Sequence, residues 1–327
     1  MKRNSRALLA SAALLALSAS SATAATDWIM ASGYAESNFM TQNIRMFIDD
    51  VKAATGGELN ITLHSNGTLI KLDGIRRAVQ TNQVQIGEIR LGGYSNEDPM
   101  YYLGALPFVA PTYESAWKLK EVQKPYFDNM FGKLGFKAVT FHPWPGQGFF
   151  TKTPVESTAD FKGRKIRIYS KATQEMSQML GFEATILPFS EIPQAFATGL
   201  IDALFTSPQT GIDIQAWDNT KYYTGVGALY SKNAIIVNSK AFSALPKNVQ
   251  DAVIAAGDKA SERGWKMSQQ TYDEQLKVLA DHGMVVTEAK PQIIDEMKKI
   301  GQKMLEDWRK VANPEANAVA DAFLASQ

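Results

Sequence analysis

The chain has 327 residues, with 34 lysines and arginines against 33 aspartates and glutamates, and it contains no cysteine. This near-neutral balance excludes the strongly basic surface of a nucleic-acid-binding protein, so we expect no nucleic-acid partner. The lack of cysteine excludes a disulfide framework and a thiolate zinc site, and about 300 residues built on ordinary hydrophobic cores suggest two lobes.

Residues 1–24 have the pattern of a signal peptide. Three cations precede the apolar run Ala7–Leu17, which is too short to span a bilayer, and Ala22-Thr23-Ala24 is typical of a signal-peptidase site. Cleavage before Ala25 removes three of the 34 cations and no acid, which leaves 31 against 33 and a net charge of −2. We expect a soluble, periplasmic protein; an uncleaved membrane anchor is the alternative.

The first half of the mature chain alternates strand-like and helix-like segments. A helix that we expect to be capped by Ser37 carries apolar residues at helical spacing and stops at Gly56. The other predicted elements are strands at 28–31, 59–63, 84–89 and 136–141, and helices at 72–81 and 113–131. This alternation predicts a mainly parallel sheet with helices on both faces.

A second α/β unit begins with a short strand in Asp160–Ser170. Ile166 and Ile168 share one face of this strand, so Arg167 points the opposite way. The elements predicted next are a helix at 172–180 with Met176, Met179 and Leu180 in the core, a helix capped by Ser190, and a strand at 201–205. Two such units predict a bilobal α/β protein, in which ligands bind beyond the carboxyl ends of strands.

The segment from Pro246 to Asp281 predicts one long helix. Pro246 suits the first turn, and Gly283 suits the position after the last. At 1.5 Å per residue this helix would approach roughly 50 Å, longer than one small lobe needs, so we expect it to cross both lobes. Residues 292–310 and 315–324 predict two further helices.

Motifs for catalysis are missing from the sequence. The three histidines form no H-E-x-x-H pair, and neither a G-x-S-x-G nucleophile elbow nor a P-loop occurs. We therefore expect no enzyme, no metal and no cofactor. The alternative from another class is a secreted hydrolase or lyase in which Glu88, His142 and Arg167 share one cleft, although a histidine such as His142 is more often structural.

Polar anchors and aromatic side chains gather at three predicted strand ends, namely Glu88-Ile-Arg90, His142–Phe150 and Phe205–Pro208. An arginine within a strand, such as Arg167, is costly to bury unless it meets an anion, and its planar group can hold a carboxylate through two parallel hydrogen bonds. Together these features predict a polar-anchored, partly apolar pocket. The alternatives are ordinary turn and core roles for the loops and an internal salt bridge for Arg167.

The run from Val155 to Pro208 resembles the solute receptors of tripartite ATP-independent periplasmic (TRAP) transporters, the DctP-type family. The resemblance rests on D-F-K-G-R-K-I-R-I at 160–168 and on L-P-F-S-E-I-P-Q-A-F-A-T-G-L-I-D-A at 187–203. The shorter segments that also fit are Asn66–Leu69, Leu106–Phe108 and 234–246. The resemblance therefore covers essentially the whole mature chain.

For the fold, the resemblance implies a bilobal periplasmic-binding-protein architecture, with two βαβ lobes joined by a hinge and by the long helix. Lobe I would comprise 25–144 plus 233–272, and lobe II would comprise 145–232 plus 273–327. For the function, it implies an extracytoplasmic receptor that closes on a small organic acid and delivers it to TRAP membrane subunits. A receptor that senses rather than transports is an alternative, and we expect a monomer.

For the site, the resemblance places the family's signature arginine on Arg167, where it grips the ligand's carboxylate. Gln147 stands where many members carry a second arginine, and Ser207 where an asparagine is frequent; Arg90 could supply a second cation. Glu88 completes the polar set. The aromatic residues expected to pack on the apolar part of the ligand are Trp144, Phe149, Tyr34 and Phe205.

The expected ligand class follows from the two positions, Gln147 and Ser207, at which the sequence differs from the family pattern. Gln147 and Ser207 argue against the multi-hydroxy acids, such as sialic and uronic acids, that are usual in the family. We expect a small or aromatic monocarboxylate, for example a 2-oxo or hydroxy acid. A sulfonate is the alternative, because its three oxygens suit the extra donors that Gln147 and Ser207 offer.

Overall fold

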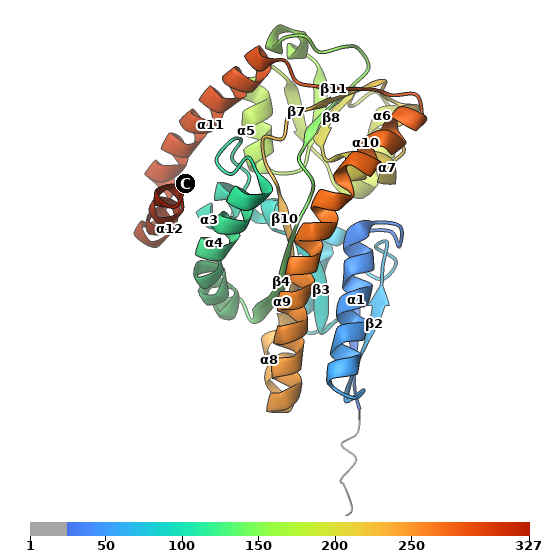
Figure 1. The fold of residues 1–327 in the computed structure, drawn as a ribbon, viewed down its shortest axis with the longest axis vertical. Coiled ribbons are helices and arrows are strands. Elements are labelled where there is room, and N and C mark those ends of the chain that lie inside the picture. Colours follow the sequence, from blue (N-terminus) through green and yellow to red (C-terminus); the bar gives the residue numbers. More distant parts are fainter. Residues whose placement is uncertain (1–24) are drawn as a thin grey trace, which may run out of the picture.

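The computed structural model describes residues 25–327, and the predicted signal peptide lies outside the described residues. Two sheets with their helices form two lobes, lobe I below and lobe II above in Figure 1. Sheet A of lobe I has the order β2 (Leu59–His64), β1 (Thr26–Ala31), β3 (Ile86–Arg90), β10 (Lys232–Asn238), β4 (Phe136–Pro143). Sheet B of lobe II has the order β11 (Val285–Glu288), β9 (Tyr222–Gly225), β5 (Gly148–Thr151), β8 (Ala203–Thr206), β6 (Lys165–Ile168), β7 (Glu183–Ile186).

Both sheets are mixed, whereas the sequence predicted mainly parallel pairing. In sheet A, β10 runs antiparallel to both β3 and β4. In sheet B, β5 runs antiparallel to both β8 and β9. The chain passes directly from β4 of one sheet into β5 of the other, and later from β9 back into β10, so each sheet contains one strand delivered by a crossover from the other lobe.

The two crossovers lie side by side between the lobes. They comprise residues 144–147, between β4 and β5, and residues 226–231, between β9 and β10. Trp144 N–H donates to the carbonyl oxygen of Ser231 at 2.8 Å, and Gly227 N–H donates to that of Gln147 at 3.0 Å. We expect these paired segments to act as the hinge. The boundary proposed at 144/145 lies inside the first segment, and the boundary proposed at 232/233 lies inside β10, one residue beyond the second segment.

Helices cover the outer faces of both sheets (Figure 1). Those beside sheet A are α1 (Phe39–Ala54), α2 (Ile75–Gln80), α3 (Pro99–Leu103), α4 (Tyr113–Lys133), α8 (Ser239–Ser243) and α9 (Lys247–Gln270). Those beside sheet B are α5 (Lys171–Met179), α6 (Ile192–Ala197), α7 (Pro208–Asp213) and α10 (Tyr272–Asp281), and the chain ends with α11 (Pro291–Val311) and α12 (Pro314–Ala325). Within residues 25–327, no helix has the length and apolarity that crossing a membrane requires.

Three local predictions are wrong. Asn38 rather than Ser37 caps α1, because its side chain accepts the N–H of Met40 at 2.9 Å. Ser190 lies inside a short 3-10 turn and caps no helix. Met179, which was predicted to lie in the core, is 48% exposed because the last residue of α5 turns away from sheet B.

The predicted long helix consists of two helices, α9 and α10, that meet at Thr271. Thr271 Oγ1 donates to the carbonyl oxygen of Met267 at 2.8 Å, and such back-bonding from a threonine bends helices. As expected, α9 packs on lobe I while α10 packs on α7 and β11 of lobe II. Gly257 permits the close contact of α9 with β4, since a Cβ there would lie 2.0 Å from the carbonyl oxygen of Val139.

The C-terminal helices return to lobe I. In Figure 1, α11 descends from lobe II, and α12 lies beside α3 and α4. Trp308 of α11 donates its indole N–H to the carbonyl oxygen of Pro99 at 2.7 Å, and Asn313 donates to the hydroxyl of Tyr126 at 2.9 Å. The C-terminal helices therefore contact both lobes, whereas the sequence-based prediction assigned residues 273–327 to lobe II alone.

Candidate functional site

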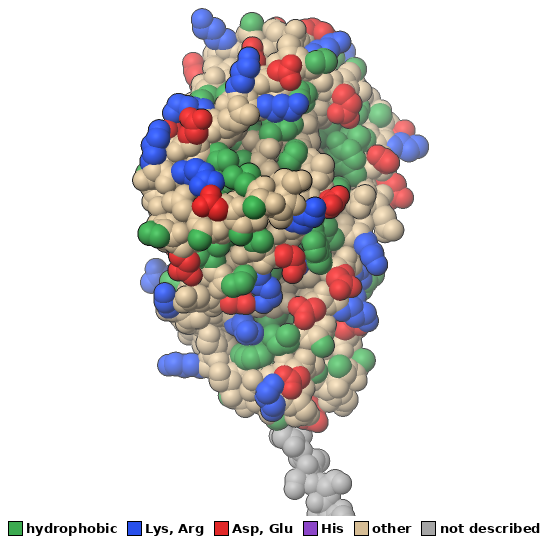
Figure 2. Space-filling view, turned by 60° about the vertical axis from the view of Figure 1, so that its left-hand side comes forward, with side chains coloured by type: hydrophobic (Ala, Val, Ile, Leu, Met, Phe, Trp, Pro, Cys, Tyr) green, Lys and Arg blue, Asp and Glu red, His purple; other side chains and the backbone are tan. Residues whose placement is uncertain are grey.

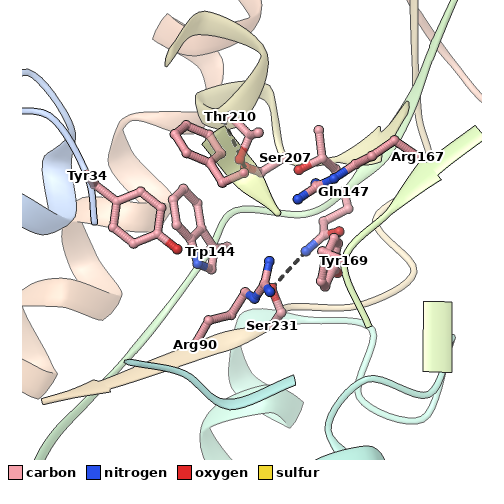
Figure 3. A pocket seen from close by; sticks show the side chains of 11 residues that line it. Tyr34, Arg90, Trp144, Gln147, Arg167, Tyr169, Ser207, Thr210 and Ser231 are labelled. Carbon is pink, nitrogen blue, oxygen red and sulfur yellow. Dashed lines mark hydrogen bonds between the residues drawn. The ribbon is translucent and has the colours of Figure 1, made fainter. Parts of the chain in front are cut away.

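A cavity lies between the lobes at the two crossovers, with an empty volume of about 330 Å³ that includes space open to solvent. Both lobes and both crossovers contribute to its wall (Figure 3). The lining residues are Tyr34, Arg90, Trp144, Gln147, Arg167, Tyr169, Phe189, Thr206, Ser207, Thr210 and Ser231. Most of these side chains are buried, so the structure corresponds to a closed arrangement of the lobes.

Arg167 is the most deeply buried cation of the cavity, with 2% of its surface exposed. Ile166 and Ile168 of the same strand point into the hydrophobic core, so alternation directs the guanidinium into the cavity. Its Nε and Nη2 both donate to the carbonyl oxygen of Leu187, at 3.1 and 3.0 Å, which fixes the plane of the group. The direction predicted for Arg167 agrees with the structure.

No aspartate or glutamate of residues 25–327 forms a salt bridge with Arg167, so the internal salt bridge considered from the sequence is wrong. Burial, and then the nearby charge of Arg90, lower the pKa of Arg167 to about 9. The guanidinium nevertheless remains mostly charged at neutral pH. A buried cation without a counter-ion is unfavourable, and an anionic ligand would relieve it.

Arg90 brings a second cation from the end of β3. Its nearest carboxylate is that of Asp73 at 3.7 Å, and its Nε has no hydrogen-bond partner within residues 25–327. The ring of Tyr169 lies 5.4 Å from the guanidinium of Arg90 and 5.8 Å from that of Arg167. Both guanidinium groups therefore lie near one phenol and face the same space (Figure 3).

Gln147 is held by two hydrogen bonds. Its Oε1 accepts from the hydroxyl of Tyr169 at 2.6 Å, and its Nε2 donates to Ser231 Oγ at 2.9 Å. Burial raises the pKa of Tyr169 to about 12, so the phenol remains a donor at neutral pH. The amide therefore links lobe II to the second crossover with a fixed orientation.

Aromatic rings form the opposite wall. The ring of Tyr34 lies 5.0 Å from that of Trp144 and 5.8 Å from that of Phe189, and because Phe189 belongs to lobe II this contact joins the lobes. Trp144 Nε1 donates to Asn233 Oδ1 at 2.9 Å, and Asn233 Nδ2 donates to Glu88 Oε1 at 2.8 Å. Glu88 thus supports the tryptophan from behind.

Small hydroxyl groups line the remaining wall, at the start of α7. Ser207 caps this helix and accepts the N–H of Thr210 at 3.2 Å. Ser207 Oγ also donates to Thr210 Oγ1 at 3.2 Å, and both residues line the cavity. Thr206, the last residue of β8, completes this side.

Six of the nine predicted site residues line the cavity, and three do not. Phe149 and Phe205 pack on each other in the core of lobe II, with ring centroids 4.9 Å apart, because residues 148–151 form strand β5 rather than a loop. Glu88 is fully buried behind the cavity, where it accepts from Ser32 Oγ at 2.6 Å and lies 3.3 Å from His142 Nε2. His142 is accordingly a structural residue.

Five lining residues were not predicted, namely Tyr169, Phe189, Thr206, Thr210 and Ser231. Tyr169 had a readable signal, since it follows Arg167 by two positions and so shares its strand face. Phe189 and Ser231 had none, because only the tertiary arrangement brings their loops to the cavity.

Two lobes that exchange strands through a paired hinge, with a charged and aromatic cavity between them, define a two-lobed solute-binding protein. The family described as bacterial extracellular solute-binding protein, family 7 (DctP), matches residues 30–312, and the chain belongs to this family. It is a solute-binding receptor of the TRAP type and not an enzyme, so the hydrolase or lyase alternative has no support.

Solved structures and a curated relative extend this likeness. DctP7 of Bordetella pertussis, an extracytoplasmic solute receptor binding pyroglutamic acid, is 41% identical, with a TM-score of 0.89 over 91% of this chain and 99% of that one. A marine-metagenome TRAP protein specific for pyroglutamate is 35% identical, with a TM-score of 0.88 over 92% and 99%. The C4-dicarboxylate-binding periplasmic protein of Rhodobacter capsulatus is 24% identical, with 70% of each chain covered.

Proposed function

We propose that this protein is the periplasmic receptor of a TRAP transporter, which binds a small organic acid through Arg167 and delivers it to the membrane subunits. The observation that carries this proposal is the buried Arg167 guanidinium, whose plane is fixed by Leu187 and which has no carboxylate partner in the part of the chain that the structure describes. A charge-assisted pair at such a position contributes roughly 1.5–3 kcal/mol, against about 1 for a neutral hydrogen bond.

For the ligand, we favour pyroglutamate or a closely similar cyclic monocarboxylate. Two receptors that are 41% and 35% identical to this chain bind pyroglutamate, and the structural match covers 99% of each of them. Pyroglutamate has one carboxylate for the arginines, a lactam N–H and carbonyl that suit the hydroxyls of Ser207 and Thr210, and a saturated ring that suits Trp144. We therefore propose that the ligand is a lactam acid, which is one kind of the monocarboxylate predicted from the sequence.

The composition of the wall supports one acid group rather than many hydroxyls. No aspartate or glutamate lines the cavity among residues 25–327, so a polyhydroxy acid would find few strong acceptors for its hydroxyl protons. The two guanidiniums instead favour negative charge or carbonyl oxygen. This argues for pyroglutamate over uronates, which some more distant structures bind.

Closure couples binding to delivery. Tyr34 of lobe I meets Phe189 of lobe II over the cavity, so a ligand enters only when the lobes separate. A bound anion then favours the closed state, because it contacts Arg167 of one lobe and Arg90 of the other. Membrane subunits that distinguish closed from open receptor would receive only loaded protein. We propose a monomer, which light scattering would check.

The test is a calorimetric and thermal-shift panel on mature receptor that has been unfolded and refolded to remove any carried ligand. The panel contains L-pyroglutamate, D-pyroglutamate, an aromatic acid, galacturonate and a lactam sulfonate. We expect nanomolar-to-micromolar binding of L-pyroglutamate alone, and its loss in Arg167→Ala but not in Arg77→Ala, an exposed control on α2. Equal binding of galacturonate would refute the ligand class. Unchanged affinity in Arg167→Ala would refute the anchoring role.

A further inference from the structure

A second buried cation lies outside the ligand cavity. Lys232 is the first residue of β10 and follows Ser231 directly, but its side chain enters a separate cavity within lobe I. It is 5% exposed, and its Nζ forms no hydrogen bond or salt bridge with any of residues 25–327. Lysine is almost never buried in this way without a partner.

The neighbouring charge makes the position more costly. Burial first, and then the like charge of Lys120, lower the pKa of Lys232 to about 8, so the ammonium is still largely protonated at neutral pH. Lys120 has partners of its own, the carboxylate of Glu121 and the ring of Trp117, which lies 3.5 Å from its Nζ. Lys232 alone is left uncompensated in this region.

The space beside the ammonium of Lys232 depends on the absence of a side chain at Gly104. Gly104 has φ −75°, which any residue adopts, yet a Cβ there would lie only 3.1 Å from Lys232 Nζ and 3.8 Å from Gln123 Oε1. That oxygen of Gln123 is buried and has no hydrogen-bond partner among residues 25–327; because it is an acceptor, a bound anion would contact Lys232 Nζ and not this oxygen. Space and a cation therefore coincide in a cavity with an empty volume of about 280 Å³, which includes space open to solvent, and Leu91, Gly92 and Met100 are among its other lining residues.

We infer that Lys232 holds a small monovalent anion, of which chloride is the natural example, in the cavity beside Gly104. The walls all belong to lobe I and the crossover residue Ser231, so the site persists whether the lobes are open or closed. One ammonium with three rotatable donors suits a monatomic anion, whereas carboxylate or phosphate prefers a planar fork of donors. The inference does not depend on the proposed ligand.

Bromide serves as the crystallographic probe. Crystals of the mature protein soaked in sodium bromide should give an anomalous peak within about hydrogen-bonding distance of Lys232 Nζ. The peak should vanish in Gly104→Ala, where the added methyl group takes the space while the lysine remains. Absence of a peak in the wild-type crystal would overturn the inference.

A solution measurement decides whether binding occurs outside the crystal. At constant ionic strength, replacement of fluoride by chloride should raise the unfolding midpoint of the wild type by a few degrees and then saturate. The rise should be absent in Lys232→Met and in Gly104→Ala, and retained in Lys266→Met, an exposed control on α9. An equal rise in all variants, or none in the wild type, would refute a specific site. If Lys232→Met does not fold, Gly104→Ala carries the test.

Discussion

Two buried polar clusters lie back to back around β3 and β10, and they differ in whether protein groups complete them. At Glu88, hydroxyl, amide and imidazole groups surround the carboxylate, with Asn233 Nδ2 at 2.8 Å as one donor. At Arg167 and Arg90, the donors outnumber the acceptors, and the carbonyl oxygen of Leu187 is the one protein acceptor within hydrogen-bonding distance of Arg167 among residues 25–327.

This difference separates scaffold from site. The completed cluster holds Trp144 in place through Asn233, whereas the incomplete one leaves charge for a ligand to neutralise. Glu88 and Arg90 lie two positions apart on the same face of β3. Glu88 belongs to the completed cluster, whereas Arg90, the last residue of the strand, belongs to the incomplete one. Buried charge alone therefore does not mark a site; uncompensated charge does.

Arg167→Met should give the largest effect on binding. Loss of one partner of a buried ion pair costs about 2–5 kcal/mol, so affinity for L-pyroglutamate should fall by roughly 30-fold to several thousand-fold. The free energy of unfolding of the ligand-free protein should stay level or rise, because an uncompensated cation is removed from the interior. Calorimetry and urea unfolding would measure the two quantities. Retained affinity with lost stability would mean that Arg167 is scaffold after all.

Glu88→Ala should give the opposite pattern. Its buried donors, including Ser32 Oγ and Asn233 Nδ2, lose their acceptor at about 1–3 kcal/mol for each unsatisfied group, so we expect the free energy of unfolding to fall by about 3 kcal/mol in total. Affinity should fall only a few-fold, through displacement of Trp144. Glu97→Ala, which breaks an exposed salt bridge with Arg76, is the control and should cost under about 1 kcal/mol. Equal losses would contradict a structural role for Glu88.

The sequence predicted the elements and side-chain directions that depend on local periodicity. Arg167 faces the cavity because alternation in a four-residue strand already requires it. Phe149 could not be placed, since β5 lies in a proline- and glycine-rich run with no readable alternation, and its pairing depends on β8 and β9. Ser231 reaches the cavity only because β10 inserts antiparallel between β3 and β4, which no local signal encodes.

Asp213 should make ligand affinity depend on pH. Its carboxylate on α7 accepts from Asn38 Nδ2 of lobe I and from Gln209 Nε2, both at 2.8 Å, and burial raises its pKa to about 6. Exposed to water in the open or unfolded state, the group returns to a pKa of about 3.9. The closed state therefore takes up a proton, and the stability that this uptake contributes is complete below about pH 4 and lost as the pH rises through about 6.

The measurable consequence lies between pH 7 and pH 5. Affinity for L-pyroglutamate should increase as the pH falls across this window, by up to about tenfold for one proton linked to closure. Asp213→Asn, which keeps a neutral acceptor for Asn38, should bind tightly across the window and flatten the profile. An unchanged slope in that variant would assign the pH dependence to another group and exclude Asp213 from closure.

Tyr169→Phe should give the smallest effect and decide how Gln147 acts. The lost hydroxyl is the donor to Gln147 Oε1, so the amide keeps only its bond to Ser231 and can rotate. We expect the free energy of binding to weaken by about 0.5–1.5 kcal/mol, which lowers the affinity by roughly twofold to thirteenfold. Tyr126→Phe removes a comparable hydroxyl, bonded to Asp98 and remote from the cavity, and should lower stability without changing affinity. If both variants lose stability and neither loses affinity, Gln147 belongs with the Glu88 cluster as scaffold, and the two arginines alone recognise the ligand.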